Sequence, residues 1–120
     1  MKTEILQVVS VLPSANIERD VKWHAEKTGF HWISGDHMYA VLKRENIYLH
    51  LQWHADTEDD PLNGGSVIKV FVKNLQPIFD EFVNRGTVTK EKLRLNTAWG
   101  TNEFGFYDLN NNAIFIVEDN

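Results

Sequence analysis

The sequence predicts an α+β fold made of two similar modules, each with the order strand, helix, strand, strand, strand. Short segments rich in β-branched residues alternate with two helix-like segments. Equivalent residues recur at nearly the same spacing. Asn16 and Asn74 (74 − 16) and Val21 and Phe79 (79 − 21) lie 58 positions apart, and Gly29 and Gly86 (86 − 29) lie 57 apart. An acidic segment, residues 55–65, ends in Gly-Gly and is typical of a linker. A length of 120 residues suits one domain. We predict module one at about 1–54, the linker at 55–65 and module two at about 66–120.

In module one, a strand is predicted over Ile5–Leu12, which is rich in β-branched residues and closed by Pro13. Asn16 is a good N-cap for the helix that follows, and Gly29 suits its C-terminal end. The buried face of this helix comprises Ile17, Val21 and Ala25. Three further strands are predicted at residues 30–34, 38–43 and 47–53.

Module two repeats this order. A strand over residues 67–72 precedes a helix that we expect Asn74 to cap and Gly86 to end. The apolar residues of this helix recur at helical spacing, so it should bury one face: Leu75, Ile78, Phe79, Phe82 and Val83. Strands follow at residues 103–107 and 113–117, joined by an Asn-rich turn, and a weaker strand is expected around residues 87–90.

Composition and charge exclude several classes of partner. The net charge is −5, from 12 Lys plus Arg and 17 Asp plus Glu, and no basic stripe that could bind nucleic acid is present. No apolar run approaches the roughly 18 residues of a membrane span, and the first apolar segment is broken by Gln7 and Ser10. The chain has no cysteine, which excludes disulfides and thiol catalysis. We predict a cytoplasmic protein without nucleic-acid or membrane partners.

Strand alternation predicts a second, mixed face on each sheet. In the strand at 47–53, alternate residues form an apolar row, and Tyr48, His50 and Gln52 lie on the opposite side. The same alternation places Lys69 and Phe115 opposite the apolar rows of their strands. A sheet face lined by aromatic and polar side chains suits a small-molecule cleft.

Three stretches carry a family resemblance that covers nearly the whole chain: VLPSANIERDVKWHAEKTGF, YAVLKRENIYLHL and TAWGTNEFGFYDLNNNAIFIVED. The chain resembles the bleomycin resistance branch of the vicinal oxygen chelate superfamily, which also contains glyoxalase I and the extradiol dioxygenases. Trp99-Gly100, Glu103-Phe104 and Asp108 match a motif of this branch. The turn departs from it, because Asp108-Leu109-Asn110-Asn111-Asn112 replaces Asp-Pro-x-Gly-Asn. The resemblance implies the glyoxalase/bleomycin resistance protein fold, with a curved mixed sheet, and a homodimer that is often swapped.

The resemblance also bears on catalysis. Metal enzymes of the superfamily take ligands from four strand positions, which by motif fall here at Val9, His50, Val67 and Phe115. Only His50 can coordinate a metal, whereas catalytic metal sites use about three protein ligands. We therefore expect no metal, no cofactor and no catalytic residues, and we favour a protein that is not an enzyme.

The resulting hypothesis is a metal-free binding protein of the bleomycin resistance type. It would form a homodimer and sequester a bleomycin-like or other planar aromatic ligand, cationic ligands included, without chemistry. The candidate ligand-binding residues are Trp32, Tyr48, His50, Lys69, Trp99, Glu103 and Phe115. Two alternatives remain open: a glyoxalase- or dioxygenase-like metalloenzyme with an atypical metal site, and a dimeric interaction domain without a ligand.

Overall fold

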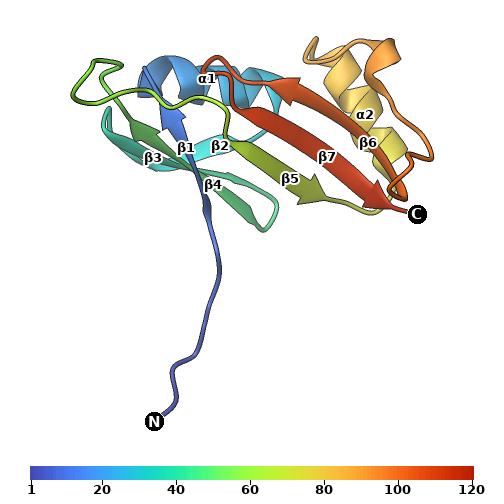
Figure 1. Ribbon diagram of the computed structural model, residues 1–120, viewed down its shortest axis with the longest axis horizontal. Coiled ribbons are helices and arrows are strands. Elements are labelled where there is room, and N and C mark those ends of the chain that lie inside the picture. The colour runs from blue at the N-terminus through green and yellow to red at the C-terminus, as the bar shows by residue number, and fades with distance from the viewer.

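The computed structural model describes residues 1–120 and contains two sheets and two α-helices (Figure 1). The first sheet has the order β1-β4-β3-β2, and the second has the order β5-β7-β6. In each sheet the first strand pairs in parallel with the last strand of its module, and the other pairs are antiparallel. The strands of the first sheet are β1 (Ser10–Ser14), β2 (His31–Gly35), β3 (Tyr39–Arg44) and β4 (Ile47–Trp53). Those of the second are β5 (Val67–Phe71), β6 (Thr101–Tyr107) and β7 (Ala113–Asp119).

The helices are α1 (Ile17–Lys27), which packs on β2, β3 and β4, and α2 (Leu75–Asn84), which packs on β6 and β7. The α+β class is therefore confirmed. The weaker strand expected at residues 87–90 is wrong, because this segment instead leads into a short 3-10 helix, Lys90–Lys92. Its polar sequence, TVTK, lacks the apolar alternation that would hold it on the sheet. We refer to β1–β4 with α1 as module one and to β5–β7 with α2 as module two.

The two helices begin differently. Asn16 caps α1 as predicted, because its side-chain oxygen accepts a hydrogen bond from the backbone N–H of Arg19 at 3.0 Å. Asn74 precedes α2 but makes no side-chain cap, since its backbone is left-handed, with φ 60°, rather than extended. The carboxylate of Glu118 in β7 accepts hydrogen bonds from the backbone N–H groups of Asn74 and Leu75 instead. The expected cap is thus replaced by an acidic side chain at the positive end of the helix.

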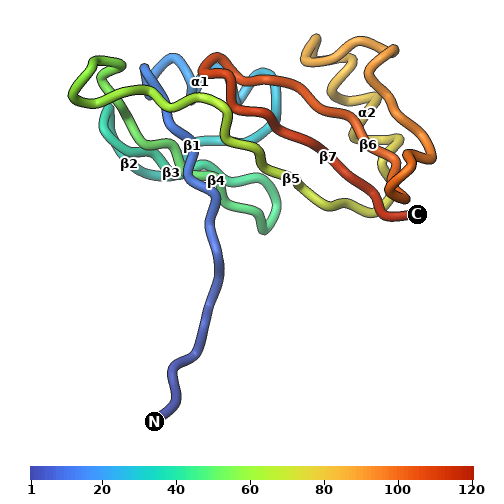
Figure 2. Tube along the Cα trace, viewed as in Figure 1, coloured from blue at the N-terminus to red at the C-terminus, as the bar shows by residue number.

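The N-terminal segment leaves the body of the protein as an extended arm, residues 1–9 (Figure 2). The expected strand over Ile5–Leu12 is therefore wrong in its bounds, because β1 begins at Ser10 and includes Pro13. Ile5, Leu6 and Val8 are exposed on the arm. In the single chain no strand lies beside residues 1–9, so their backbone groups have no ladder to join.

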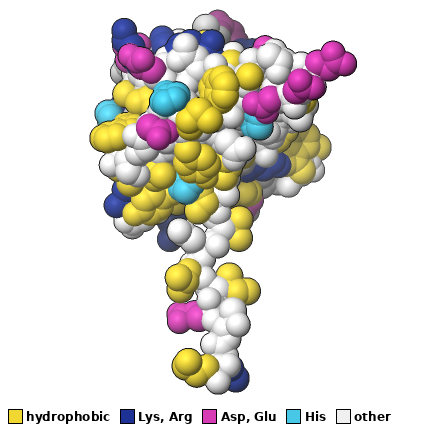
Figure 3. Space-filling view, turned by 90° about the vertical axis from the view of Figure 1, so that its left-hand side faces the viewer, with side chains coloured by type: hydrophobic (Ala, Val, Ile, Leu, Met, Phe, Trp, Pro, Cys, Tyr) yellow, Lys and Arg dark blue, Asp and Glu magenta, His cyan; other side chains and the backbone are white.

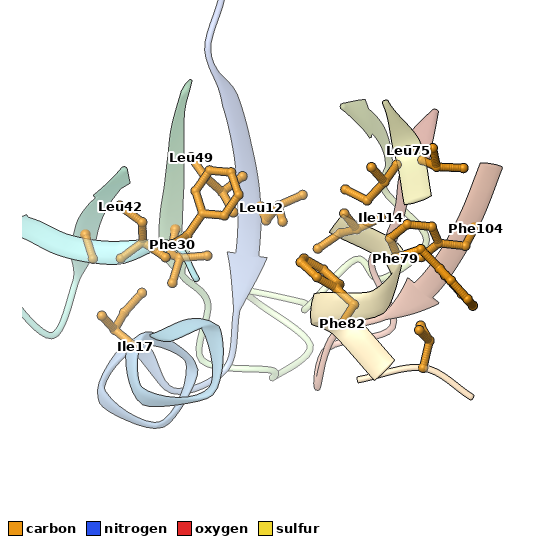
Figure 4. Packing of buried hydrophobic residues seen from close by; sticks show 14 residues of the cluster. Leu12, Ile17, Phe30, Leu42, Leu49, Leu75, Phe79, Phe82, Phe104 and Ile114 are labelled. Carbon is orange, nitrogen blue, oxygen red and sulfur yellow. The ribbon is translucent and has the colours of Figure 1, made fainter. Parts of the chain in front are cut away.

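The buried apolar side chains form one cluster with contributions from both modules. In Figure 4, one group surrounds Leu12, Phe30 and Leu49, and a second group surrounds Phe82 and Phe104. Phe104 is fully buried, and its ring makes edge-to-face contacts with Phe79 and Phe82 at centroid distances of 5.2 and 5.5 Å. Trp23 joins the modules, with its ring 6.3 Å from that of Phe106. Trp23 therefore packs within the chain.

Charged side chains join the C-terminal ends of the two helices. Glu81 of α2 accepts two hydrogen bonds of 2.6 Å from Arg44 of β3 and one of 2.7 Å from Arg85. Arg44 also donates to the carbonyl oxygen of Thr28, and Arg85 donates to those of Ala25 and Glu26. The last carbonyls of a helix have no partner within it, so the two arginines satisfy the end of α1 from outside the helix.

Replacing Glu81 by Gln is expected to lower the free energy of unfolding by about 1 kcal/mol at pH 7. The effect is no larger because the ion pair of Glu81 with Arg44 is partly exposed, so that water screens it. The Arg44 guanidinium holds the pKa of Glu81 at about 2. The native state favours the charged carboxylate, so this contribution is complete above pH 4.5 and is lost as the pH falls towards 2. Urea unfolding at pH 7 and pH 2.5 measures it, with Asp80→Asn, on the same helix, as the control. An equal loss in both variants would contradict the prediction.

Candidate functional site

None of the helices is long and apolar enough to span a bilayer.

The face of each sheet opposite the helices, here called the open face, carries most of the predicted site residues. On the first sheet, His50 lies beside Val11 of β1, and on the second, Lys69 lies beside Phe115 of β7. Lys69 and Val11 thus occupy equivalent places in the two modules, 58 positions apart (69 − 11). The duplicated pattern therefore extends to the open face.

His50 is held by a tyrosine that the sequence interpretation missed. The hydroxyl of Tyr39 and Nδ1 of His50 lie 2.8 Å apart, and their rings meet edge to face. Tyr39 belongs to the neighbouring strand, where it pairs with Gln52, two residues from His50. The short Glu45-Asn46 turn between the two strands could have predicted this register. Next to His50 along the strand, the ring of Tyr48 lies 5.3 Å from the ammonium group of Lys43.

On the second sheet, Trp99 and Glu103 form a connected unit. The indole N–H of Trp99 donates to Glu103 Oε1 at 2.7 Å, and the hydroxyl of Thr101 donates to the same oxygen at 2.6 Å. Glu103 is only 3% exposed, whereas Trp99 is 59% exposed. The guanidinium of Arg94 lies over the indole ring at 5.7 Å. Trp99 is therefore a flat, exposed ring whose edge is fixed by a buried carboxylate.

The charge of Glu103 depends on these partners. Burial alone would raise the pKa of its carboxyl, but the hydrogen bonds from Thr101 and Trp99 and the charges of Lys69 and Arg94 outweigh burial and hold the pKa below its usual range. Glu103 is thus ionised at neutral pH. Its Oε2 accepts no hydrogen bond within the chain, so it remains available to a ligand.

The ring of Phe115 in β7 lies against Gly105 of the neighbouring strand β6. A Cβ atom at Gly105 would come within 2.6 Å of the Phe115 ring, so the ring lies against the glycine backbone. Gly105 therefore leaves room for the aromatic ring on the open face. Phe115 and Tyr107 also line a hollow of about 560 Å³ with Lys92 and Arg94.

The seven predicted residues do not converge on one cavity within the single chain. Tyr48 and Lys69 line a cavity of about 470 Å³ between the modules, and Phe115 lines the hollow in module two. His50, Trp99 and Glu103 line neither. Trp32 pairs with the buried Leu42 and lies beside Ile17 and Val21, on the side covered by α1. A register shift between Trp32 and Ser34 interrupts the alternation in β2, which is why simple parity gives no guide to the direction of Trp32.

The strand partners of His50 and Phe115 differ from the residues that the family motif suggested as metal-ligand positions. Val11 rather than Val9 is the neighbour of His50, and Lys69 rather than Val67 is the neighbour of Phe115. No group of three or more His, Cys, Asp or Glu side chains is arranged to hold a metal ion. On the second sheet, the side chain beside Phe115 is the ammonium group of Lys69, where the sequence expectation placed the apolar Val67.

Sequence comparison finds bleomycin resistance proteins. No family model matches the chain. The bleomycin resistance protein of Geobacillus stearothermophilus is 20% identical over 128 aligned residues, covering 95% of this chain and 97% of the relative. A bleomycin resistance protein of Staphylococcus aureus matches with the same identity and coverage.

Solved structures with the same fold also include bleomycin-binding proteins. The bleomycin resistance determinant encoded on transposon Tn5 superposes with a TM-score of 0.79 at 16% identity, over 96% of this chain and 98% of its own. The bleomycin-binding protein of Streptomyces verticillus in complex with copper(II)-bleomycin gives a TM-score of 0.73 at 20% identity, over 99% of this chain and all of its own. A glyoxalase-related enzyme from Clostridium phytofermentans gives 0.74 at 14% identity, over 98% of each chain. The fold is thus shared by binding proteins and enzymes.

Proposed function

Because the chain has the glyoxalase/bleomycin resistance protein fold and resembles bleomycin resistance proteins over 95% of its length, we propose that it is a small-molecule binding protein of this type. It sequesters a bleomycin-like or other planar aromatic ligand, including a cationic one, in the cytoplasm and leaves it chemically unchanged. The two modules and the linker at residues 55–65 act as one domain. This activity would confer antibiotic resistance by removing the free drug.

The observation that carries the proposal is the Trp99–Glu103 unit. Trp99 is exposed and held at its edge by a hydrogen bond to Glu103. A ring fixed in this way can stack on a flat ligand with little loss of side-chain entropy, and such contacts contribute roughly 0.5–1.5 kcal/mol beyond the buried area. The ionised Glu103, with its unused Oε2, adds a partner for a basic group.

The proposed cleft is completed by a second copy of the chain. The predicted residues of one chain are spread over two sheets that share no cavity containing all of them. The arm at residues 1–9 exposes Ile5, Leu6 and Val8, and it extends far from the body (Figure 3). Phe71 and Tyr107 add exposed apolar surface to the open face of module two. A swapped homodimer, in which each arm packs on the partner, would cover this surface and bring two open faces together.

Calorimetric titration of the full chain with bleomycin tests the ligand assignment. Binding at micromolar concentrations, with intact bleomycin recovered by mass spectrometry, is the expected result. Absence of heat at tens of micromolar would overturn the assignment to bleomycin, and a modified product would indicate an enzyme instead.

Replacing Trp99 by Ala is expected to weaken bleomycin binding about thirtyfold, as for an aromatic residue at the centre of an interface. Trp32→Ala is the matched control, because Trp32 is similarly exposed, at 51%, but lies on the helix-covered side. The control should bind within about twofold of the original chain. Equal weakening by the two substitutions would contradict the assignment of Trp99 to the cleft.

Substitution in the arm tests the dimer. Leu6→Asp with Val8→Asp places charges on exposed apolar positions of the arm and is expected to convert a dimer into a monomer in sedimentation equilibrium. Gln7→Asp, between them, adds a charge at a polar position and should leave the dimer intact. A monomeric original chain would contradict the proposed assembly.

A further inference from the structure

The cavity of about 470 Å³ between the modules has features of a binding site in its own right. Its size lies within the roughly 300–1,000 Å³ typical of ligand pockets. Most of its 19 lining residues are hydrophobic, and they come from both modules, with Phe30 and Leu49 on one side and Phe82, Phe106 and Ile114 on the other. Figure 4 shows the labelled side chains of the two modules in two groups, on either side of β1. Lys69 is the one residue with a full charge in the lining, and it is exposed to solvent.

A buried histidine lines this cavity with one ring nitrogen unused. His24 of α1 is 1% exposed, and its Nδ1 lies 3.1 Å from the hydroxyl oxygen of Thr28. That hydroxyl donates its single hydrogen to the carbonyl oxygen of His24 at 2.9 Å, so towards the ring it can only accept. Nδ1 must therefore carry the ring hydrogen, and Nε2 is an acceptor. Nε2 makes no hydrogen bond within the chain.

His24 remains neutral under ordinary conditions, which keeps Nε2 available as an acceptor. Burial lowers the pKa of its imidazole to about 4, despite the opposing charge of Asp20. Nε2 is not sealed from solvent, since Asn112 Oδ1 is the only fully buried side-chain polar atom without a hydrogen-bond partner. An occupant with a donor can therefore bond to Nε2 from within the apolar lining, which offers few other polar partners. A cationic occupant would lose its hydration in an apolar lining and meet only the like charge of Lys69. An anionic one could pair only with Lys69, which is exposed, so that solvent screens the attraction.

We propose that the cavity is a second binding site, for a small uncharged aromatic or aliphatic molecule that carries one hydroxyl or N–H group. The donor group bonds to Nε2 of His24, and the apolar part packs between Phe30, Phe82 and Ile114. The lining of this site does not include Trp99 or Glu103, but it shares Tyr48, Lys69 and the arm residues Gln7–Val9 with the site and dimer proposed above. The two proposals are therefore separated by the choice of ligands and readouts.

The test uses 2-naphthol and naphthalene, which have the same ring system and differ in the hydroxyl donor. With the full chain labelled with ¹⁵N, the Nε2 resonance of His24 is expected to move on saturation with 2-naphthol and to remain near its free position with naphthalene. 2-Naphthol should bind about tenfold more tightly, as one net hydrogen bond predicts. An Nε2 resonance that 2-naphthol leaves unmoved, or absence of binding by both compounds, would overturn the proposal.

Two variants sharpen the result. His24→Phe removes the acceptor and should bind the two compounds with equal affinity, whereas a retained preference for 2-naphthol would count against the role of His24. Val70→Phe adds bulk to the cavity lining and should weaken both compounds together. If His24→Phe does not fold, the resonance shift in the original chain decides the question. Because neither readout uses bleomycin, this proposal and the proposed function can fail separately.

Discussion

Asp20→Ala is expected to lower the free energy of unfolding by about 3 kcal/mol, because two buried donors lose their acceptor together. Asp20 is 2% exposed and accepts hydrogen bonds from Ser14, Arg19 and Asn110. Asn110 lies in the turn between β6 and β7, 90 positions away, so this carboxylate joins the start of α1 to module two. The loss would therefore weaken both the local turn and the contact between the modules.

Urea unfolding at pH 7 measures the effect, with a double-mutant cycle to assign it. Asn110→Ala alone should also destabilise the protein, and the double variant should be less destabilised than the sum, since the two side chains share one interaction. Asp80→Ala on the exposed surface of α2 is the matched control for the loss of one carboxylate. A loss below about 1 kcal/mol, or strict additivity in the cycle, would show that the network contributes little.

The stability of the protein is expected to fall by about 3 kcal/mol between pH 7 and pH 4 through His24 alone. Burial lowers the pKa of His24 from 6.5 to about 4, so the unfolded chain binds a proton that the native state excludes. The contribution is therefore complete above pH 6.5 and is lost progressively as the pH falls towards 4. The Glu81 contribution is lost in a lower range, from pH 4.5 towards 2, so the upper part of the profile reports on the histidine.

Denaturant unfolding at intervals between pH 7.5 and 4 measures this dependence. His24→Gln, which cannot take up a proton in this range, should show a flatter profile even if it is less stable at every pH. His37→Gln is the control, because His37 is exposed, and it should keep the original slope. If His24→Gln and the original chain have parallel profiles, the burial of His24 does not control the acid response.

The local elements follow closely from the sequence. The strand predicted at residues 47–53 coincides with β4, and Asn16 caps α1 as its position suggested. His50 and Phe115 face away from the buried rows of their strands, as alternation predicted. Such features depend on neighbours within a few residues and on the two-residue period of a strand, both of which are written in the order of the side chains.

Several features of the site could be decided only by tertiary structure. The backbone N–H groups at the start of α2 donate hydrogen bonds to Glu118, which lies 43 or 44 positions away in the sequence. Asp20 likewise accepts a hydrogen bond from Asn110 of module two. Arg94 reaches Trp99 from an isolated backbone bridge to Glu103 that lies outside the named strands. These contacts satisfy buried or charged groups through partners that are remote in sequence, and sequence periodicity does not identify such partners.

The sequence by itself determined the two helices, all strands except the one wrongly expected at residues 87–90, the face that most strands bury, and the motif that relates the chain to bleomycin resistance proteins. The tertiary structure decided that the arm at residues 1–9 extends from the body and that His24 lines a cavity between the modules. It also decided that Trp32 lies beside Ile17 and Val21, on the side of the sheet that α1 covers. The physical reason is that strand and helix patterns arise from local side-chain alternation. The way two modules meet depends instead on satisfying buried polar groups and filling space across the whole chain.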